Sequence, residues 1–278
     1  MAKIIKDIMN IVEELAPIYL AEAWDNCGLL VGDERKEVKK LLVALEPSME
    51  NIDNAVKNDV DLIVTHHPLM MNKINKITST TVEGEKLMKL IKNEIGLYCA
   101  HTNLDKAQEG LNFYLGKQLK LADIQVLSIE KSYEQLNVNN DQEFSIDYNT
   151  MGLGVIGSLK EKLTLAQFSK DIQKLLKLDY IHYVGDKGRM IKKVAIVTGS
   201  GFSELDKAII KGADVFITGD IKYHNAQYAK EAGIALIDAT HFGSENIVVE
   251  LLGNIFNNKL SDVEILLDYT AKNPIQIL

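Results

Sequence analysis

The sequence has few cysteines, no long apolar run and no excess of basic residues, and each absence excludes a class of protein. Its two cysteines, Cys27 and Cys99, are too few and too far apart for a disulfide framework or a zinc–thiolate site. No apolar run approaches the roughly 20 residues that span a bilayer, and charged residues interrupt any signal-peptide core at the start. The net charge of −8 argues against general binding to nucleic acid or to a membrane surface. We therefore expect a cytoplasmic protein with reduced thiols.

What the sequence does contain is an alternation of helix and strand patterns typical of a soluble α/β protein. Its 278 residues, 46% hydrophobic and 25% charged, can form one large domain or two ordinary ones. Helical spacing of apolar residues predicts helices, and short apolar runs bounded by Gly, Asp or Pro predict buried strands. In chain order, the first half predicts helix 3–16, strands 29–31 and 41–45, helix 48–57, strand 61–64, loop 70–81, helix 83–93 and strand 96–100.

The second half of the sequence repeats the order of the first. With an offset of 153 residues, Val31-Gly32-Asp33 falls on Val184-Gly185-Asp186, and the strand that ends at Thr65 falls on the one that ends at Thr218. A shorter loop then reduces the offset to 140, which places strand 96–100 on residues 236–240. Because this register agrees with every predicted element, we interpret the chain as an internal duplication.

The predicted architecture is therefore α/β, with two related units and a metal site in the cleft between them. We place the first unit at residues 1–123 and the second at 124–278, and leave open whether the terminal segments cross between the units. Residues 124–150 are polar without a clear period, so we expect a loop or an irregular excursion there, followed by a strand at 152–159.

Histidines and carboxylates gather where the predicted strands end. His66 and His67 follow one strand and precede Pro68, which favours a bend that turns both side chains toward one place. In open α/β sheets, ligands bind outside the carboxyl ends of the strands. This histidine pair alone is equally compatible with two hydrogen-bonded residues that bind nothing. In both copies, however, a later strand ends in His-x-x-x-carboxylate, as His101…Asp105 and His241…Glu245.

These side chains point to metal chemistry. Neutral imidazole together with carboxylate suits Zn, Fe, Mn or Co. Six candidate ligands exceed what one tetrahedral ion needs, so two divalent ions that share a bridging carboxylate, about 3.5–4 Å apart, fit better. Such a site keeps a positive charge, which favours an anionic substrate and the activation of water.

Several longer motifs resemble the Nif-three-like family, whose members are often labelled "GTP cyclohydrolase 1 type 2 homologue". The matching stretches are Trp24 to Asp33, Thr65-His66-His67-Pro68-Leu69, His101 to Asp105, Gly199-Ser200-Gly201, Thr218-Gly219-Asp220 and His241 to Glu245. The resemblance covers nearly the whole chain, in the family's shorter form without its extra inserted domain. Two positions depart from the family pattern: Glu46 stands where an Asp is expected, and Cys27 stands where a small apolar residue is more usual.

The resemblance implies roles for individual residues. The ligands of a dinuclear metal site would be His66, His67, Asp105, His241 and Glu245. His101 would lie beside the metals as a supporting group or as a proton carrier, and is our candidate catalytic acid or base. The family resemblance also implies a toroidal homohexamer.

Two functions follow, from different classes. The first is dinuclear-metal-dependent hydrolysis of an anionic small molecule, in one version a nucleotide such as GTP. The alternative is a non-catalytic metal-binding ring that acts as a scaffold or that stores and delivers metal. Gly199-Ser200-Gly201 has two equal interpretations, a phosphate cradle or a tight turn. We expect structural or surface roles for His182 and His224, and solvated positions for Lys73, Lys76 and Lys222.

Overall fold

The computed structural model describes residues 2–129 and 151–277. The chain forms two compact units, which are described separately: unit 1 comprises Met1–Leu104 and Val248–Leu278, and unit 2 comprises Asp105–Ile247. The chain thus divides after Leu104 and after Ile247, whereas the sequence placed one boundary after residue 123. The C-terminal segment returns to unit 1, which is the crossing that the sequence analysis left open.

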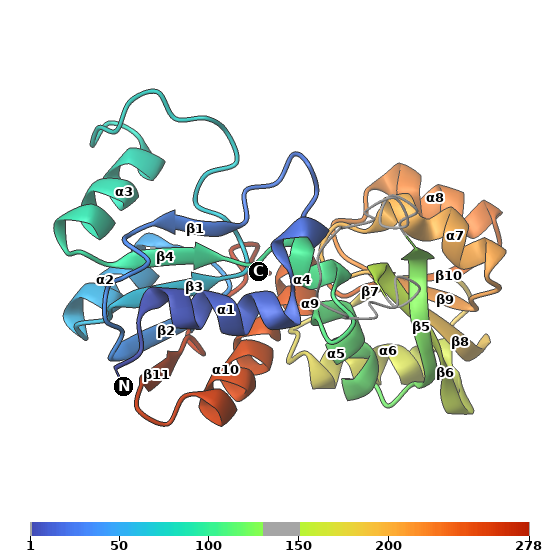
Figure 1. Ribbon diagram of the computed structural model, residues 1–278. Coiled ribbons are helices and arrows are strands. Elements are labelled where there is room, and N and C mark those ends of the chain that lie inside the picture. Colours follow the sequence, from blue (N-terminus) through green and yellow to red (C-terminus); the bar gives the residue numbers. More distant parts are fainter. Residues whose placement is uncertain (1, 130–150, 278) are drawn as a thin grey trace. The chain divides into compact units, whose positions relative to one another are not determined.

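Unit 1 is built on a five-stranded sheet in the order β1-β4-β3-β2-β11 (Figure 1). Strands β2, β3, β4 and β11 are parallel, and β1 runs antiparallel to β4. The strands are β1 Gly28–Val31, β2 Lys40–Ala44, β3 Leu62–Thr65, β4 Gly96–Cys99 and β11 Glu264–Leu267. The helices are α1 Ile5–Leu15, η1 Ile18–Leu20, α2 Met49–Lys57, α3 Val82–Lys92, α4 Thr102–Lys106, whose last two residues already belong to unit 2, and α10 Val248–Lys259.

The predicted helices and strands of unit 1 form for the expected reasons. Every residue of β3 and of β4 is buried, as in parallel strands that are covered on both faces. Helix α1 buries Ile5, Ile8 and Val12, which recur at helical spacing. Helix α2 begins where predicted, because the Ser48 hydroxyl accepts a hydrogen bond from the Asn51 amide at 3.0 Å.

Unit 2 has a six-stranded sheet in the order β5-β6-β8-β9-β10-β7 (Figure 1). Its central strands β8, β9 and β10 are parallel, and the remaining neighbours pair antiparallel. The strands are β5 Ala122–Ile129, β6 Gly152–Thr164, β7 His182–Val184, β8 Met190–Ile196, β9 Val215–Thr218 and β10 Ala235–Asp238. The helices are α5 Leu111–Gln118, α6 Leu165–Leu175, η4 Phe202–Glu204, α7 Leu205–Ile210, α8 Tyr223–Glu231 and α9 His241–Glu245.

The core of unit 2 lies on both faces of its sheet. On one face, α5 and α6 contribute Phe113, Leu115 and Phe168 to a single apolar cluster. On the other face, α7 and α8 contribute Leu205 and Ala229 to a second cluster. The parallel strands between the two clusters are therefore buried on both sides, as their continuous apolar runs predict.

One expectation for unit 2 is wrong. Residues 124–129 were expected to lie in a loop, but they belong to β5, which pairs with β6 from Ile129 opposite Gly152 to Ala122 opposite Ser158. The buried core of β5 is the short run Val126-Leu127-Ser128, and this run is too brief to produce a clear period. The rest of the expected loop, 130–150, lies outside the described residues.

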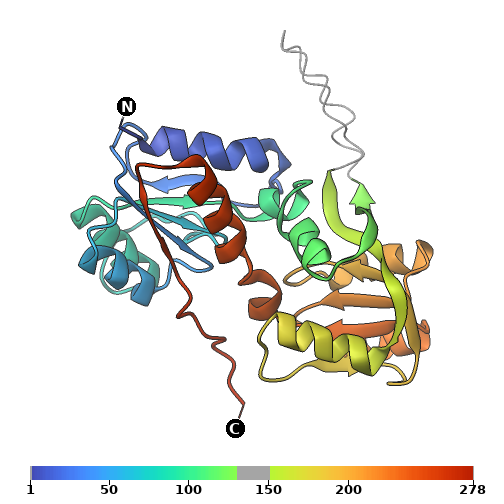
Figure 2. The same cartoon turned by 90° about the horizontal axis from the view of Figure 1, so that it is seen from below.

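The two sheets confirm that the units are related. The order β1-β4-β3-β2 of unit 1 recurs as β7-β10-β9-β8 in unit 2, and in both the first pair is antiparallel and the others are parallel. The helix that follows each copy packs in the other unit. Helix α5 follows the first copy but belongs to unit 2, whereas α10 and β11 follow the second copy and complete unit 1 (Figure 2). This exchange explains why the chain divides after Leu104 and after Ile247.

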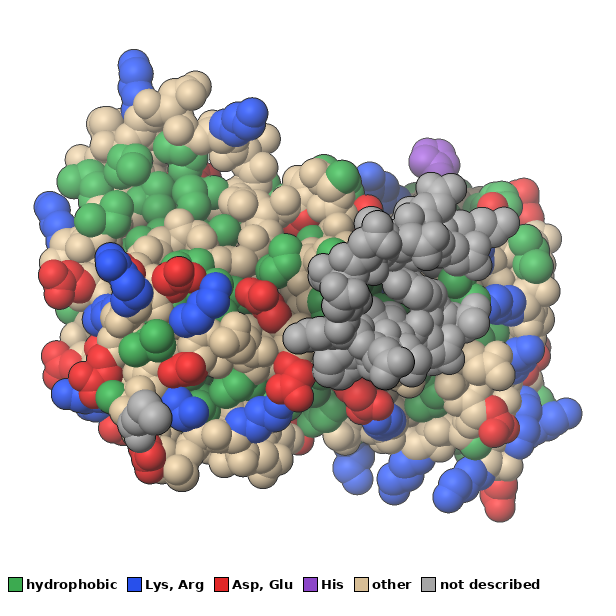
Figure 3. Space-filling view, in the orientation of Figure 1, with side chains coloured by type: hydrophobic (Ala, Val, Ile, Leu, Met, Phe, Trp, Pro, Cys, Tyr) green, Lys and Arg blue, Asp and Glu red, His purple; other side chains and the backbone are tan. Residues whose placement is uncertain are grey.

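The surface carries charges of both signs. On the face drawn in Figure 3, acidic and basic side chains are interspersed over unit 1. Among the residues that the structure describes, no helix has the length and apolar character needed to cross a bilayer.

Candidate metal centre

Three predicted histidines of unit 1 come together at one edge of its sheet. His66 and His67 directly follow β3, and His101 follows β4, the parallel neighbour of β3. Each histidine offers a ring nitrogen within 4.8 Å of the others. The ring centroids of His66 lie 5.1 Å from those of both His67 and His101. His66 is fully buried, and the other two are partly buried.

The Nδ1 atom of each ring faces an oxygen. His66 Nδ1 lies 2.8 Å from the Ala100 carbonyl oxygen, and His67 Nδ1 lies 2.6 Å from Glu46 Oε1. His101 Nδ1 lies 2.9 Å from Asp25 Oδ1. Carbonyl and carboxylate oxygens only accept, so Nδ1 is the nitrogen that carries the proton. In the neutral ring, the lone pair is then on Nε2, which is the atom a metal ion would bind.

Asp25 organises this part of unit 1. Its side chain is fully buried and accepts hydrogen bonds from the Asn26 amide at 2.7 Å, from the Cys27 thiol at 3.1 Å and from His101. The amide and the hydroxyl of Thr102 also donate to it. Burial alone would raise the pKa of this carboxyl, but the hydrogen bonds from His101 and Thr102 outweigh it and hold the pKa well below the ordinary value of 3.8.

In unit 2, His241 and Glu245 form a second pair of candidate ligands. They begin and end the short helix α9, so that one helical turn separates them. His241 Nε2 lies 2.8 Å from Glu245 Oε2, and its Nδ1 lies 2.7 Å from Asp220 Oδ2. The Nδ1 atom therefore faces an oxygen here as well. The hydrogen bond to Glu245, stronger in effect than the opposing burial, raises the pKa of His241 to about 9.

Asp105 lies in unit 2 near the same pair. Its carboxylate is 8% exposed and accepts a long hydrogen bond, 3.5 Å, from the hydroxyl of Thr198. The next residue, Gly199, approaches Glu245 so closely that a Cβ atom on it would overlap Glu245 Oε1. Asp105 and Glu245 thus both contact the segment Thr198-Gly199. No metal group among the described residues includes Asp105 itself.

The structure favours the tight-turn interpretation of Gly199-Ser200-Gly201. The Gly199 amide donates to the Ser244 hydroxyl at 3.0 Å, and the Gly201 amide donates to the Thr218 hydroxyl at 2.8 Å. Both amides therefore already have partners within the protein, and the helical segment η4 that follows has only three residues. The φ of +63° at position 199 also explains why a glycine stands there, since glycine adopts a positive φ without strain.

Sequence reasoning assigned no role to the three carboxylates that bind histidine Nδ1 atoms: Asp25, Glu46 and Asp220. Signals for two of them existed. Asp25 is part of the Trp-Asp-Asn-Cys-Gly stretch, and Asp220 falls on His67 under the offset of 153. The two remaining histidines, His182 and His224, are exposed, and neither belongs to a metal group among the described residues.

In the absence of a bound ion, the protein is expected to lose stability as the pH rises from 6.5 to about 9. The pKa of His241 is raised from 6.5 to about 9 in the folded chain, so the folded state holds this proton more tightly than the unfolded state. The stabilisation is complete below pH 6.5 and is lost as the pH rises through 9. Urea unfolding of chelator-treated protein at both ends of this range measures it. The His241→Gln variant should lose this part of the pH dependence; an unchanged pH dependence in that variant would assign the effect to other groups.

Comparison with known proteins identifies the family. The sequence profile of Duf34/NIF3 (NGG1p interacting factor 3) matches residues 3–274. A "GTP cyclohydrolase 1 type 2 homolog" of Clostridium perfringens is 36% identical over 275 residues, which cover 99% of each chain, so neither carries a large domain that the other lacks. The crystal structure of Staphylococcus aureus protein SA1388 is similar, with a TM-score of 0.88 and 31% identity over the full length of both chains. Reduced HcgD from Methanocaldococcus jannaschii has a TM-score of 0.78 and 32% identity, covering 97% of this chain and 99% of its own. The chain therefore belongs to the Duf34/NIF3 family.

Proposed function

We propose that the protein is a metal-dependent hydrolase that acts on an anionic small molecule, with two divalent ions per chain. The ligands in this proposal are His66, His67, Asp105, His241 and Glu245, and His101 is the acid or base. The observation that carries the proposal is the uniform setting of four histidines, His66, His67, His101 and His241, whose Nδ1 atoms all face a carbonyl or carboxylate oxygen.

This setting fits a metal site. A histidine that binds a metal through one nitrogen commonly donates its other N–H to a carboxylate or carbonyl, which fixes the ring and its tautomer. At His241 the Nε2 atom also faces Glu245, and a cation bound by these two groups would replace the proton that they now share. The donor set of imidazole and carboxylate, without thiolate, suits Zn, Fe, Mn or Co.

Several of the proposed ligands lie close in sequence to the points where the chain passes from one unit to the other. The chain passes from one unit to the other at Leu104–Asp105 and at Ile247–Val248. His101 lies three residues before the first crossing and Asp105 directly after it, and Glu245 lies two residues before the second. The proposed ligands thus belong to both units, with His66 and His67 in unit 1 and Asp105, His241 and Glu245 in unit 2.

The chemistry of such a centre is hydrolytic. Bound ions would supply a water of lowered pKa and a positive charge that attracts an anion. His101 would take up or release a proton at Nε2, while Asp25 holds its Nδ1 at 2.9 Å and keeps the ring in place. The label on the relatives names GTP, and ring-opening hydrolysis of a nucleotide is one version of this proposal.

We also propose that the chain associates with copies of itself. The family resemblance implies a homohexamer. An exposed apolar surface on unit 1 supports a protein contact. Hydrophobic side chains gather there (Figure 3), and exposed residues of α3 and the loop before it include Ile77, Val82 and Ile91, at 50%, 64% and 54% of full exposure.

Elemental analysis of protein purified without added metal is the direct test. We expect about two ions per chain in the native protein. The variants His66→Ala and Glu245→Ala should lose metal, whereas His101→Ala should keep it and should lose turnover in a screen of nucleotides and phosphoesters. His224→Ala, which removes an exposed histidine, is the matched control and should behave as the native protein.

Two results would contradict the proposal. A native protein that contains no metal and takes up none on incubation would favour a scaffold without metal chemistry. Full metal content together with full turnover in His101→Ala would remove the acid–base role of that histidine.

A further inference from the structure

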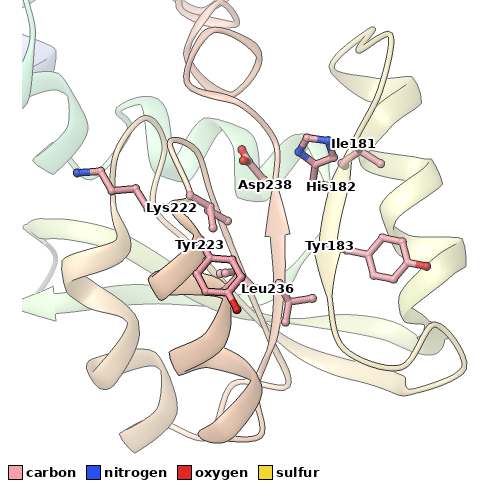
Figure 4. Close-up of a pocket in the computed structure, with 10 residues that line it drawn as sticks. Ile181, His182, Tyr183, Lys222, Tyr223, Leu236 and Asp238 are labelled. Atoms are coloured by element: carbon pink, nitrogen blue, oxygen red, sulfur yellow. The ribbon is translucent and has the colours of Figure 1, made fainter. Parts of the chain in front are cut away.

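A pocket of about 480 Å³ lies in unit 2, and none of the proposed metal ligands lines it. It is an open pocket, lined by residues of β7, of β10 and of the start of α8 (Figure 4). We propose that this pocket binds the base of a nucleotide, so that the substrate class of the proposed hydrolase is a nucleotide. The inference rests on the proposed function. The volume of the pocket is within the range of small-molecule sites.

The floor of the pocket is apolar, and an aromatic ring stands at one side of it. Strand β10 pairs with β7 so that Leu236 lies opposite Val184, and their side chains therefore share one face. Both line the pocket. Tyr223 stands beside this floor (Figure 4) and is 72% exposed, although its ring is large and apolar. An aromatic base that stacks on such a ring would shield its apolar face from water. Stacking of this kind tolerates different bases.

Polar groups stand at two other positions of the pocket. Asp238 lies opposite His182 in the β10–β7 pair, and both line the pocket. One oxygen of Asp238 accepts from the Thr240 amide at 2.9 Å, and its carboxylate, only partly buried, can accept an N–H from a base as well. Lys222 brings a positive charge from the start of α8, where a phosphate group is also favoured by the helix dipole. This combination of an apolar floor beside an aromatic ring, an acceptor and a cation matches the parts of a nucleotide.

The pocket adjoins a candidate metal ligand. Two of its lining residues, Ile221 and Lys222, directly follow Asp220, which holds His241 Nδ1 at 2.7 Å. On the other strand, Asp238 is three residues before His241. A nucleotide whose base occupies the pocket would thus have its anionic part close to His241, where the proposed ions would bind it.

Calorimetric titration with guanosine 5′-monophosphate, ribose 5-phosphate and guanosine tests the inference. Native protein should bind the nucleotide about tenfold or more tightly than the sugar phosphate, because only the nucleotide carries a base that can stack. Tyr223→Ala should weaken nucleotide binding about tenfold and leave the sugar phosphate unchanged. Lys222→Ala should weaken both phosphates and spare guanosine. Tyr228→Ala is the matched control, because Tyr228 is on the same helix and 48% exposed but does not line the pocket.

Equal affinity of the native protein for the nucleotide and the sugar phosphate would overturn the inference, as would a Tyr223→Ala variant with native nucleotide affinity. Because Tyr223 is largely exposed, its replacement should leave the fold intact, and thermal unfolding checks this. The same titrations on chelator-treated protein separate the two proposals. If the protein prefers the nucleotide even without metal, nucleotide binding in the pocket is supported, whatever elemental analysis shows about the metal site. If a metal-loaded protein shows no such preference, only the proposal about the pocket is contradicted.

Discussion

Replacing Gly199 with alanine is expected to destabilise unit 2 by about 2–5 kcal/mol and to weaken metal binding at the proposed centre. Gly199 has a φ of +63°, which an alanine adopts at a cost, and its Cβ would overlap Glu245 Oε1. Glu245 is only 3% exposed, so its carboxylate cannot swing into solvent to make room. Either the turn or the carboxylate must move, and movement of the carboxylate would break its contact with His241 Nε2.

Urea unfolding and elemental analysis of Gly199→Ala measure both effects. The matched control is Gly212→Ala, because Gly212 also has a positive φ, +74°, but nothing lies within 4 Å of the position of its Cβ. The control should lose only about 1–2 kcal/mol from backbone strain and should keep its metal. Equal destabilisation of the two variants, with metal retained in both, would show that Glu245 yields easily and that its position beside Gly199 has no importance for metal binding.

The duplication was predictable because its evidence is local. Each strand and helix carries its own apolar pattern, so the sequence offset of 153 places residues 62–65 on 215–218, and these are the observed bounds of β3 and β9. The exchange of α5 and α10 between the units was not predictable in the same way. An amphipathic helix shows which of its faces will be buried, but its pattern does not say which of two similar sheets will cover that face.

The histidines were predictable, but their pairing with the groups that hold them was not. His66, His67, His101 and His241 stand at strand ends, where the sequence pattern of an α/β protein places a site. Their partners come from elsewhere in the chain: Asp25 lies 76 residues from His101, and Glu46 lies 21 residues from His67. Asp25 and Glu46 lie in irregular segments, just before a strand and a helix respectively. The direction of a loop side chain depends on tertiary packing rather than on any periodic pattern.

Replacing Asp25 with alanine should have the other large effect, a loss of about 3–5 kcal/mol in the free energy of unfolding. The change removes a fully buried carboxylate and leaves the donors of Asn26, Cys27, Thr102 and His101 without their acceptor. Buried donors that lose their partner lose the hydrogen bond without regaining water. His101 would also lose the contact that keeps the proton on Nδ1, and long-range ¹H–¹⁵N spectra of its ring should show a mixture of tautomers.

The control for this prediction is Asp33→Ala in the same unit. Asp33 also accepts several hydrogen bonds, from the amide and the guanidinium of Arg35, but both side chains are exposed. Exposed ion pairs contribute little because water replaces the lost contacts, so this variant should unfold as the native protein does. If Asp25→Ala proved as stable as Asp33→Ala and kept a single His101 tautomer, Asp25 would not be the group that positions His101, and the acid–base role would have to rest on another partner.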